Sequence, residues 1–201
     1  MKNNNNLRSF VIAGIEKRKE IIDSDFFLNE GVEAIQEIVA ILTSALLNGN
    51  KLMFCGNGGS AAESQHMAAE YCATLDHNKP RKGYKAIALS TDTSLLTAWS
   101  NDFGYEGIFE RQVDVLGDKG DVLICYSTSG NSENVLRAAK LAIEKKIHVI
   151  GFSGVREGKL DKFSEVSFKS PSPETPIIQE HHTIAGHIIC SCVEKNIEGD
   201  S

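Results

Sequence analysis

The sequence predicts an α/β domain with a three-layer, doubly wound parallel five-stranded sheet and two extra N-terminal helices. Five apolar runs are rich in Val, Ile and Leu and do not alternate with polar residues, as in strands buried on both faces. They lie at residues 52–55, 86–89, 122–126, 147–152 and, more weakly, 165–168. Helical patterns separate them, at residues 60–75, 92–116, 132–146 and about 177–196. This alternation of strand and helix is typical of a parallel sheet covered on both sides.

The chain begins with two predicted helices that a minimal α/β domain does not require. Apolar residues recur at helical spacing over 7–28, and a second stripe runs from a predicted N-cap at Asn29 to Asn48-Gly49. We expect residues 1–6, which include an Asn tract, to be disordered. We therefore expect a single domain over 1–201, in which 7–48 serves oligomer packing and 51–196 forms the α/β core.

Two later helices carry boundary signals in the sequence. The helical stretch 92–116 is expected to break near Gly104 or Gly107. The last helix has a clear start, because Thr175 is suited to an N-cap and Pro176 to the first helical position.

Composition restricts the classes of function. The 201-residue chain is 41% hydrophobic and 24% charged, which is typical of a globular domain. Its net charge of -6 and the lack of a basic block argue against a nucleic-acid partner. No apolar run approaches the roughly 20 residues of a membrane span, and no secretory leader is visible. With five cysteines in apolar or helical patterns, the sequence predicts a reduced, cytoplasmic protein.

A hydroxyl-rich loop follows the third predicted strand. Ser127-Thr128-Ser129-Gly130-Asn131-Ser132 opens a helix, and ligands of such sheets bind beyond the carboxyl ends of the strands. Hydroxyls and helix N-terminal N–H groups together suit a phosphate monoester. No P-loop lysine follows, so a nucleoside triphosphate is not favoured. The alternative is that these residues only cap the helix and form the turn.

A glycine-rich turn, Gly56-Asn57-Gly58-Gly59-Ser60, joins the first strand to its helix and predicts a second anion-binding loop. Gly56-x-Gly58-x-x-Ala61 formally matches the dinucleotide fingerprint. That fingerprint also needs an acidic residue about 20 positions later, on the next strand. The nearest candidate, Asp92, is much too far along the chain, so a nicotinamide cofactor is not favoured.

Two helices carry candidate metal ligands or proton-transfer groups. His66 and Glu70 are four residues apart and share a helix face, and Gln179 and His187 are two turns apart on the last helix. If the helices meet, these four side chains offer donors that suit zinc, although Gln is an uncommon ligand. The alternative for His66 and Glu70 is a surface pair. We expect His181-His182 to face solvent or an interface. Asp102, beside Asn101, is suited either to a sugar hydroxyl or to a turn.

Taken together, these motifs resemble bacterial phosphoheptose isomerase, a member of the sugar isomerase (SIS) domain family. The resemblance runs in order over about residues 30–195. It rests on Cys-Gly-Asn-Gly-Gly-Ser at 55–60, His66 with Glu70, Asn101-Asp102-Phe103-Gly104, the loop 127–132, and Gln179-Glu180 with His187. The serine-rich loop is common to many SIS domains, whereas the His/Glu and Gln/His quartet is more specific.

The resemblance implies a flavodoxin-like SIS fold and conversion of sedoheptulose 7-phosphate to D-glycero-D-manno-heptose 7-phosphate, the first step towards ADP-heptose and lipopolysaccharide. It implies a cytoplasmic homotetramer with one zinc ion per subunit. By match, Glu70 and His187 would be catalytic. The zinc ligands would be His66, Glu70, Gln179 and His187. The substrate would be bound by Asn57, Gly58, Gly59, Ser60, Glu70, Asn101, Asp102, Ser127, Thr128, Ser129, Ser132 and Gln179.

Other functions are compatible with the same fold. One alternative is a non-enzymatic SIS tetramer that binds the replication initiator protein, and such a protein need not keep the quartet. A sugar-phosphate-sensing regulatory domain is another, but nothing here resembles an attached DNA-binding module. A third is an SIS isomerase of pentose or hexose phosphates.

Overall fold

The computed structural model describes residues 2–199, and of residues 2–5 only the backbone; Met1, part of the segment expected to be disordered, lies outside the described residues. In chain order the elements are α1 (Lys2–Ile22), η1 (Phe27–Gly31), α2 (Val32–Leu47), β1 (Leu52–Gly56), α3 (Gly59–Cys72), β2 (Ala86–Ala88), α4 (Thr93–Phe103), η2 (Tyr105–Gly107), α5 (Ile108–Leu116), β3 (Val122–Tyr126), α6 (Glu133–Glu144), β4 (His148–Ser153), η3 (Lys159–Lys162), β5 (Val166–Lys169) and α7 (Thr175–Glu198).

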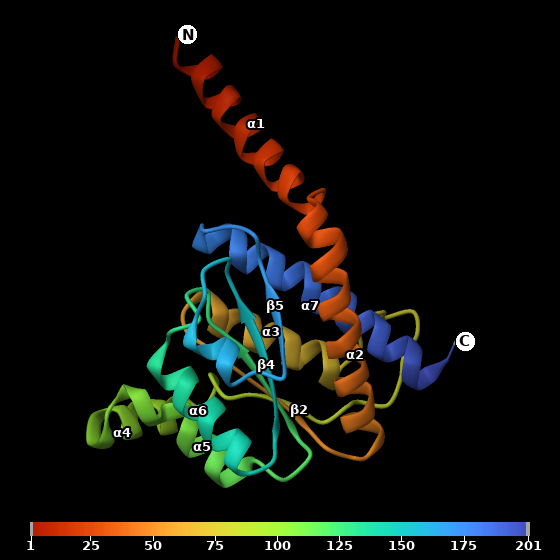
Figure 1. Ribbon diagram of the computed structural model, residues 1–201, viewed down its shortest axis with the longest axis vertical. Coiled ribbons are helices and arrows are strands. Elements are labelled where there is room, and N and C mark those ends of the chain that lie inside the picture. Colours follow the sequence, from red (N-terminus) through yellow and green to blue (C-terminus); the bar gives the residue numbers. More distant parts are fainter. Residues whose placement is uncertain (1, 200–201) are drawn as a thin grey trace.

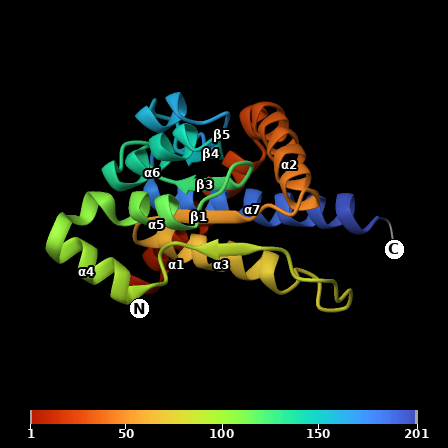
Figure 2. The ribbon, with the colours of Figure 1, turned by 90° about the horizontal axis from the view of Figure 1, so that it is seen from below.

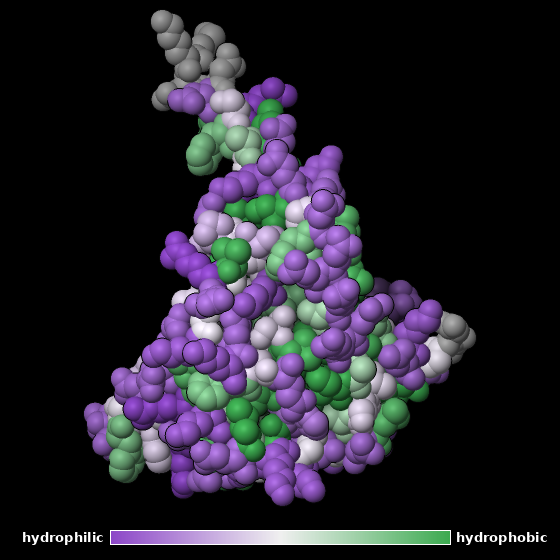
Figure 3. All heavy atoms as spheres, viewed as in Figure 1, coloured by the Kyte–Doolittle hydropathy of each residue, from purple (hydrophilic) through white to green (hydrophobic). Residues whose placement is uncertain are grey.

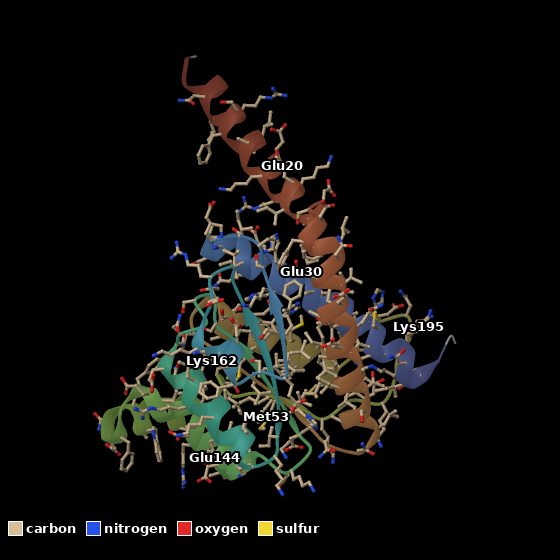
Figure 4. All side chains as sticks on the ribbon, viewed as in Figure 1. Glu20, Glu30, Met53, Glu144, Lys162 and Lys195 are labelled. Atoms are coloured by element: carbon tan, nitrogen blue, oxygen red, sulfur yellow. The ribbon has the colours of Figure 1, made fainter. Side chains whose placement is uncertain are left out.

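The five strands form one parallel sheet in the order β2-β1-β3-β4-β5. Helices α2, α3 and α7 pack on one face, while α5 and α6 cover the other (Figures 1 and 2). Each face has its own apolar cluster, and β1 and β3 are buried along their whole length. Met53, labelled in Figure 4, lies at the centre of the body and is fully buried. The predicted three-layer, doubly wound fold is therefore confirmed.

The order 2-1-3-4-5 reverses direction between β1 and β3, and ligands of doubly wound sheets bind at such a switch point. The strands run in register here, with Gly56 of β1 opposite Tyr126 of β3. The loops that follow these two residues are the glycine-rich turn and the hydroxyl-rich loop. The fold thus brings the two predicted anion-binding loops to neighbouring positions.

Three predicted helix boundaries differ in the structure. Helix α1 begins at Lys2 rather than near residue 7. Asn29 is not an N-cap, because it lies inside η1, where the backbone stays helical and its side chain donates to the Asp25 carbonyl. At the start of α7 the N-cap is Glu174 rather than Thr175, with no side-chain capping bond. The predicted break of the stretch 92–116 is confirmed, because η2 separates α4 from α5.

Helix α1 projects away from the body of the domain (Figure 1). Its C-terminal half is held to α7 by the ion pairs Lys17–Glu174 and Arg18–Glu180, the latter with two hydrogen bonds of 2.6 and 2.8 Å. The projecting part exposes five large apolar side chains: Leu7, Phe10, Val11, Ile12 and Ile15. Figure 3 shows apolar surface on this projecting part. Within residues 2–199, no helix combines the length and apolar character needed to cross a bilayer.

Candidate active site

The centre of the candidate site lies between α3 and α7, where His66 and His187 meet. Their Nε2 atoms are 2.8 Å apart, and the rings are perpendicular with centroids 4.9 Å apart. The residues are 121 positions apart in the sequence, and the packing of α3 against α7 on one sheet face brings them together. Two imidazole nitrogens thus point at a common position.

Glu70 completes a cluster with these two histidines. Its Oε1 lies 3.7 Å from His66 Nδ1, as the four-residue spacing on a helix predicts. One nitrogen or oxygen atom from each of His66, Glu70 and His187 lies within 4.8 Å of the others. The side chain of Glu70 is 20% exposed and that of His66 is 44% exposed, so a small ligand can reach the cluster.

Gln179, the fourth member of the predicted quartet, lines a hollow of about 390 Å³ together with His66. Its amide group lies against Gly59, where a Cβ atom would come within 2.5 Å of Gln179 Oε1. Glycine at position 59 therefore leaves the space in which the Gln179 side chain sits. The structure thus brings His66, Glu70 and His187 together and places Gln179 on the adjoining hollow.

Glu63 is a site residue that our sequence analysis missed. It is only 8% exposed; its Oε2 accepts a hydrogen bond of 2.6 Å from the Thr183 hydroxyl, and its Oε1 has no partner. Burial raises the pKa of this carboxyl, while the Thr183 hydrogen bond and the nearby imidazoles of His66 and His187 act in the opposite direction. The spacing 63, 66, 70 places these three residues on one helix face, and that periodicity is the signal that could have found Glu63.

In the hydroxyl-rich loop between β3 and α6, one hydroxyl serves the turn while others are not used to cap the helix. Ser132 is the N-cap residue of α6, yet its hydroxyl makes no capping bond and instead lies 3.0 Å from the Ser127 hydroxyl. Ser129 does serve the turn, because its Oγ accepts from the Asn131 N–H. Within the described residues the Thr128 hydroxyl has no hydrogen-bond partner. Hydroxyls that are not used for capping remain available to a bound anion.

The glycine-rich turn after β1 uses its glycines for geometry. Gly58 has a φ of +57°, a conformation that favours glycine, and the chain enters α3 immediately afterwards. Asn57 is hydrogen-bonded to Asn134 at the start of α6 and to the Tyr105 hydroxyl. Ser60 is buried in the first turn of α3. The turn is therefore held against both the start of α6 and η2.

Asn101 and Asp102 lie in the last turn of α4, where both are exposed. Asn101 Nδ2 donates to Asp102 Oδ1 over 2.7 Å. Within the described part of the chain, no hydrogen bond or ion pair joins them to the other predicted site residues. Three residues after Asp102, the Tyr105 hydroxyl is hydrogen-bonded to Asn57, another predicted site residue.

His181 and His182 are not a solvent-facing pair, and this expectation was wrong. Both are 1% exposed. His181 Nδ1 lies 2.7 Å from the Ser170 hydroxyl, and His182 Nε2 donates to the Ser153 carbonyl over 3.1 Å. Burial lowers the pKa of both imidazoles, that of His182 to about 4. They lie on the face of α7 that packs against the sheet, and this face is largely buried.

The donor set of the cluster fits a zinc ion. Two imidazole nitrogens that point at each other, with a carboxylate oxygen beside them, are the ligand types that zinc prefers. The carboxamide of Gln179 on the adjoining hollow could supply a fourth donor. The buried Glu63 carboxyl lies beside the same site, where the His66 and His187 imidazoles act to lower its pKa against the larger, raising effect of burial.

Comparisons with known proteins identify the family. Residues 20–154 match the family model described as SIS domain. The chain is 44% identical over 194 residues to the phosphoheptose isomerase of Clostridium acetobutylicum, covering 96% of this chain and 98% of that protein. A phosphoheptose isomerase structure from Neisseria gonorrhoeae superposes with a TM-score of 0.79 at 36% identity, covering 97% and 100% of the two chains.

A phosphoheptose isomerase from Francisella tularensis gives a TM-score of 0.83 at 29% identity, with the same coverage of 97% and 100%. The similarity therefore extends over the N-terminal helices as well as the α/β core. The chain belongs to the phosphoheptose isomerase family of SIS-domain proteins, a family of sugar-phosphate isomerases.

Proposed function

We propose that this protein converts sedoheptulose 7-phosphate to D-glycero-D-manno-heptose 7-phosphate. The observation that carries the proposal is the cluster of His66, Glu70 and His187. The helices that hold it pack on the same sheet whose strand β3 leads into the hydroxyl-rich loop. Membership of the phosphoheptose isomerase family supports the seven-carbon substrate. We assign the reaction to the first step of ADP-heptose and lipopolysaccharide core synthesis, in the cytoplasm. Five free cysteines are compatible with a reducing compartment.

Aldose–ketose isomerisation moves a proton between C1 and C2 through an enediol and requires a base near the carbon. We assign this base to the Glu70 carboxylate. The His187 imidazole, on the other side of the cluster, exchanges protons with the substrate oxygens. His187 Nε2 lies 2.8 Å from His66 Nε2, so the two imidazoles share the centre of the cluster.

Zinc would be held by His66, Glu70, Gln179 and His187. When bound, it would supply Lewis-acid polarisation of a substrate oxygen. The ligand types and the shared hollow of His66 and Gln179 support this set. Elemental analysis of the purified protein checks it, with one zinc per chain expected and loss of the metal in the variant His66→Ala.

The remaining predicted residues would bind the sugar phosphate. The phosphate would lie on the hydroxyl-rich loop, with Ser127, Thr128, Ser129 and Ser132 as its ligands. The sugar chain would then extend towards the cluster along Asn57, Gly58, Gly59, Ser60, Asn101, Asp102 and Gln179. Binding of the distant phosphate would orient the reacting end, so that binding energy is used for positioning.

The projecting helix α1 supports a homotetramer. Its apolar side chains remain exposed to solvent on a single chain, and contact with other copies of the chain would bury them. We propose that α1 and α2 form the helical centre of this assembly. A mass of four chains by light scattering is the expected result, and a monomer would contradict it.

A substrate panel tests the function. Five-, six- and seven-carbon ketose phosphates are incubated with the protein, with and without a chelator, and aldose formation is measured. We expect conversion of sedoheptulose 7-phosphate only, with loss of turnover after chelation and recovery with zinc. No conversion of any sugar phosphate would favour the non-enzymatic alternative, a tetramer that binds the replication initiator protein. Preference for a shorter sugar would reassign the substrate.

A further inference from the structure

Tyr105, the first residue of η2, is hydrogen-bonded to the glycine-rich turn. Its hydroxyl lies 2.8 Å from Asn57 Oδ1. Asn57 and Asn134 also exchange two amide hydrogen bonds of 2.9 Å each. We propose that Tyr105 is a positioning residue that, with Asn134, fixes the Asn57 carboxamide so that one N–H faces the sugar phosphate. This inference rests on the proposed function, because it assigns Asn57 to that substrate.

The donors and acceptors of this network have only one consistent arrangement. The orientation of an amide is decided by its hydrogen-bond partners. Two facing amides could in principle both be turned over without losing their mutual bonds. Here the backbone N–H of Val135 also donates to Asn134 Oδ1, over 3.0 Å. The same N–H also donates to the Ser132 carbonyl over 3.0 Å, but a turned Asn134 would place an NH₂ group 3.0 Å from this N–H, so the orientation with the Asn134 oxygen facing Val135 is the favourable one.

The fixed orientation of Asn134 passes to Asn57 and then to Tyr105. Asn57 Nδ2 must donate to Asn134 Oδ1, and Asn57 Oδ1 must accept from Asn134 Nδ2. Because Asn57 Oδ1 faces the phenol, Tyr105 must be the donor of their hydrogen bond. A backbone N–H of α6 thus determines the direction of every hydrogen bond in the network.

This arrangement leaves one functional group of Asn57 unused. Its oxygen accepts two hydrogen bonds, which fills its ordinary capacity, and one of its two amide hydrogens is taken by Asn134. Within the described residues, the second hydrogen has no acceptor. Asn57 is half-buried, so this hydrogen is available to a ligand. The network therefore presents Asn57 as a donor, which suits phosphate or sugar hydroxyl oxygens.

The network also links the glycine-rich turn to residues that directly follow the other two segments with proposed substrate ligands. Asn57 belongs to the glycine-rich turn, Asn134 follows the hydroxyl-rich loop, and Tyr105 lies three residues after Asp102. Tyr105 is 53% exposed and Asn134 is 3% exposed. A half-exposed phenol contributes little to the core, so its directed hydrogen bond favours a role in positioning over one in packing.

The variant Tyr105→Phe removes the hydroxyl and keeps the ring. We expect a roughly fivefold higher KM for sedoheptulose 7-phosphate, the effect of losing about one hydrogen bond, with kcat within twofold of wild type. The melting temperature should not change. The matched control is Tyr84→Phe, which removes a hydroxyl bound to Glu198 over the same 2.8 Å and should leave KM unchanged. An unchanged KM in Tyr105→Phe would overturn the proposal.

A double-mutant cycle with Asn57→Ala tests whether Tyr105 acts through Asn57. We expect Tyr105→Phe to have no further effect on KM once Asn57 is alanine. Losses that multiply would show that Tyr105 acts on the substrate independently, and the proposal would be wrong. Calorimetric titration of the same four proteins with sedoheptulose 7-phosphate keeps the two proposals separate. If the wild-type protein binds the sugar phosphate but does not convert it, the proposed function is wrong, and the double-mutant cycle measured in Kd still tests Tyr105. If the wild-type protein does not bind it, both proposals are wrong.

Discussion

Helix α7 carries two kinds of histidine, and their surroundings give them opposite properties. His187 faces α3, reaches His66 at 2.8 Å and lies in a cluster with a carboxylate. His181 and His182, six and five residues earlier, are buried among the aromatic rings of Phe27, Tyr126, Phe152 and Phe168. Histidines on one helix thus contribute to the candidate catalytic cluster at one face and act as neutral packing groups at another.

This difference shows what makes a histidine available for chemistry. The buried pair is hydrogen-bonded to Ser170 and Ser153, and among the described residues neither imidazole is hydrogen-bonded to a carboxylate, while burial disfavours the charged imidazole. The cluster at His187 has a partner imidazole, a carboxylate and access to solvent. Helix face and access, rather than residue type, therefore distinguish the two sets.

The largest expected effect is that of Glu70→Gln, which removes a carboxylate from the cluster while keeping its shape. We expect kcat to fall by roughly 10³ or more, because the proposed base is lost. Affinity for sedoheptulose 7-phosphate, measured by calorimetric titration, should remain within a few-fold of wild type. The side chain is 20% exposed, so we expect the variant to fold. A turnover rate like that of wild type would show that Glu70 is not the base.

His187→Gln should have the next largest effect, a fall in kcat of roughly 10² or more, as expected from the loss of acid–base assistance. Zinc content is measured alongside, since His187 is also a proposed ligand. A rate loss with the metal retained supports proton transfer, whereas a loss that follows the metal content would restrict His187 to holding the ion.

The control for His187→Gln is His148→Gln. His148 is half-buried, pairs with Glu165 over 3.0 Å and begins β4, at the end of the sheet away from the carboxyl edge. We expect its rate to equal that of wild type. A comparable loss in both variants would indicate a general effect of replacing histidine rather than a catalytic role.

The fold could be predicted from the sequence because parallel strands buried on both faces leave unusually plain apolar runs. Runs such as 122–126 became strands with nearly the expected limits. Boundaries that depend on a single polar residue were less predictable. Asn29 lies within continuous helical backbone, and the N-cap of α7 is Glu174 rather than Thr175. Tertiary packing of α2 and α7, rather than one polar residue, determines where those helices begin.

For the site, spacing predicted neighbours on one helix but not contacts between helices. His66 with Glu70 followed from a four-residue interval, whereas the meeting of His66 with His187 depends on how α3 and α7 pack. Glu63 has the right interval, yet its burial beside Thr183 is a tertiary property. The buried position of His181 and His182 likewise follows from the face that α7 turns to the sheet.

The smallest of the expected effects concerns the buried pair and the pH dependence of stability. The pKa of His182 is lowered from 6.5 to about 4, so the folded protein resists protonation that the unfolded chain accepts. The free energy of unfolding should therefore fall as pH drops below 6.5 and level off near 4. This one group predicts a loss of about 2 kcal/mol between pH 7.5 and pH 5.

His182→Leu tests this assignment, because leucine is neutral at every pH and has a similar size. The Ser153 carbonyl would keep a donor, since it also accepts from the Ser170 N–H. Unfolding by urea at equal protein concentration should show a shallower pH dependence in the variant, by about 2 kcal/mol over the same interval. An equal dependence in His182→Leu would mean that His182 does not resist protonation in the fold, and the contrast between the two faces of α7 would then rest on geometry alone.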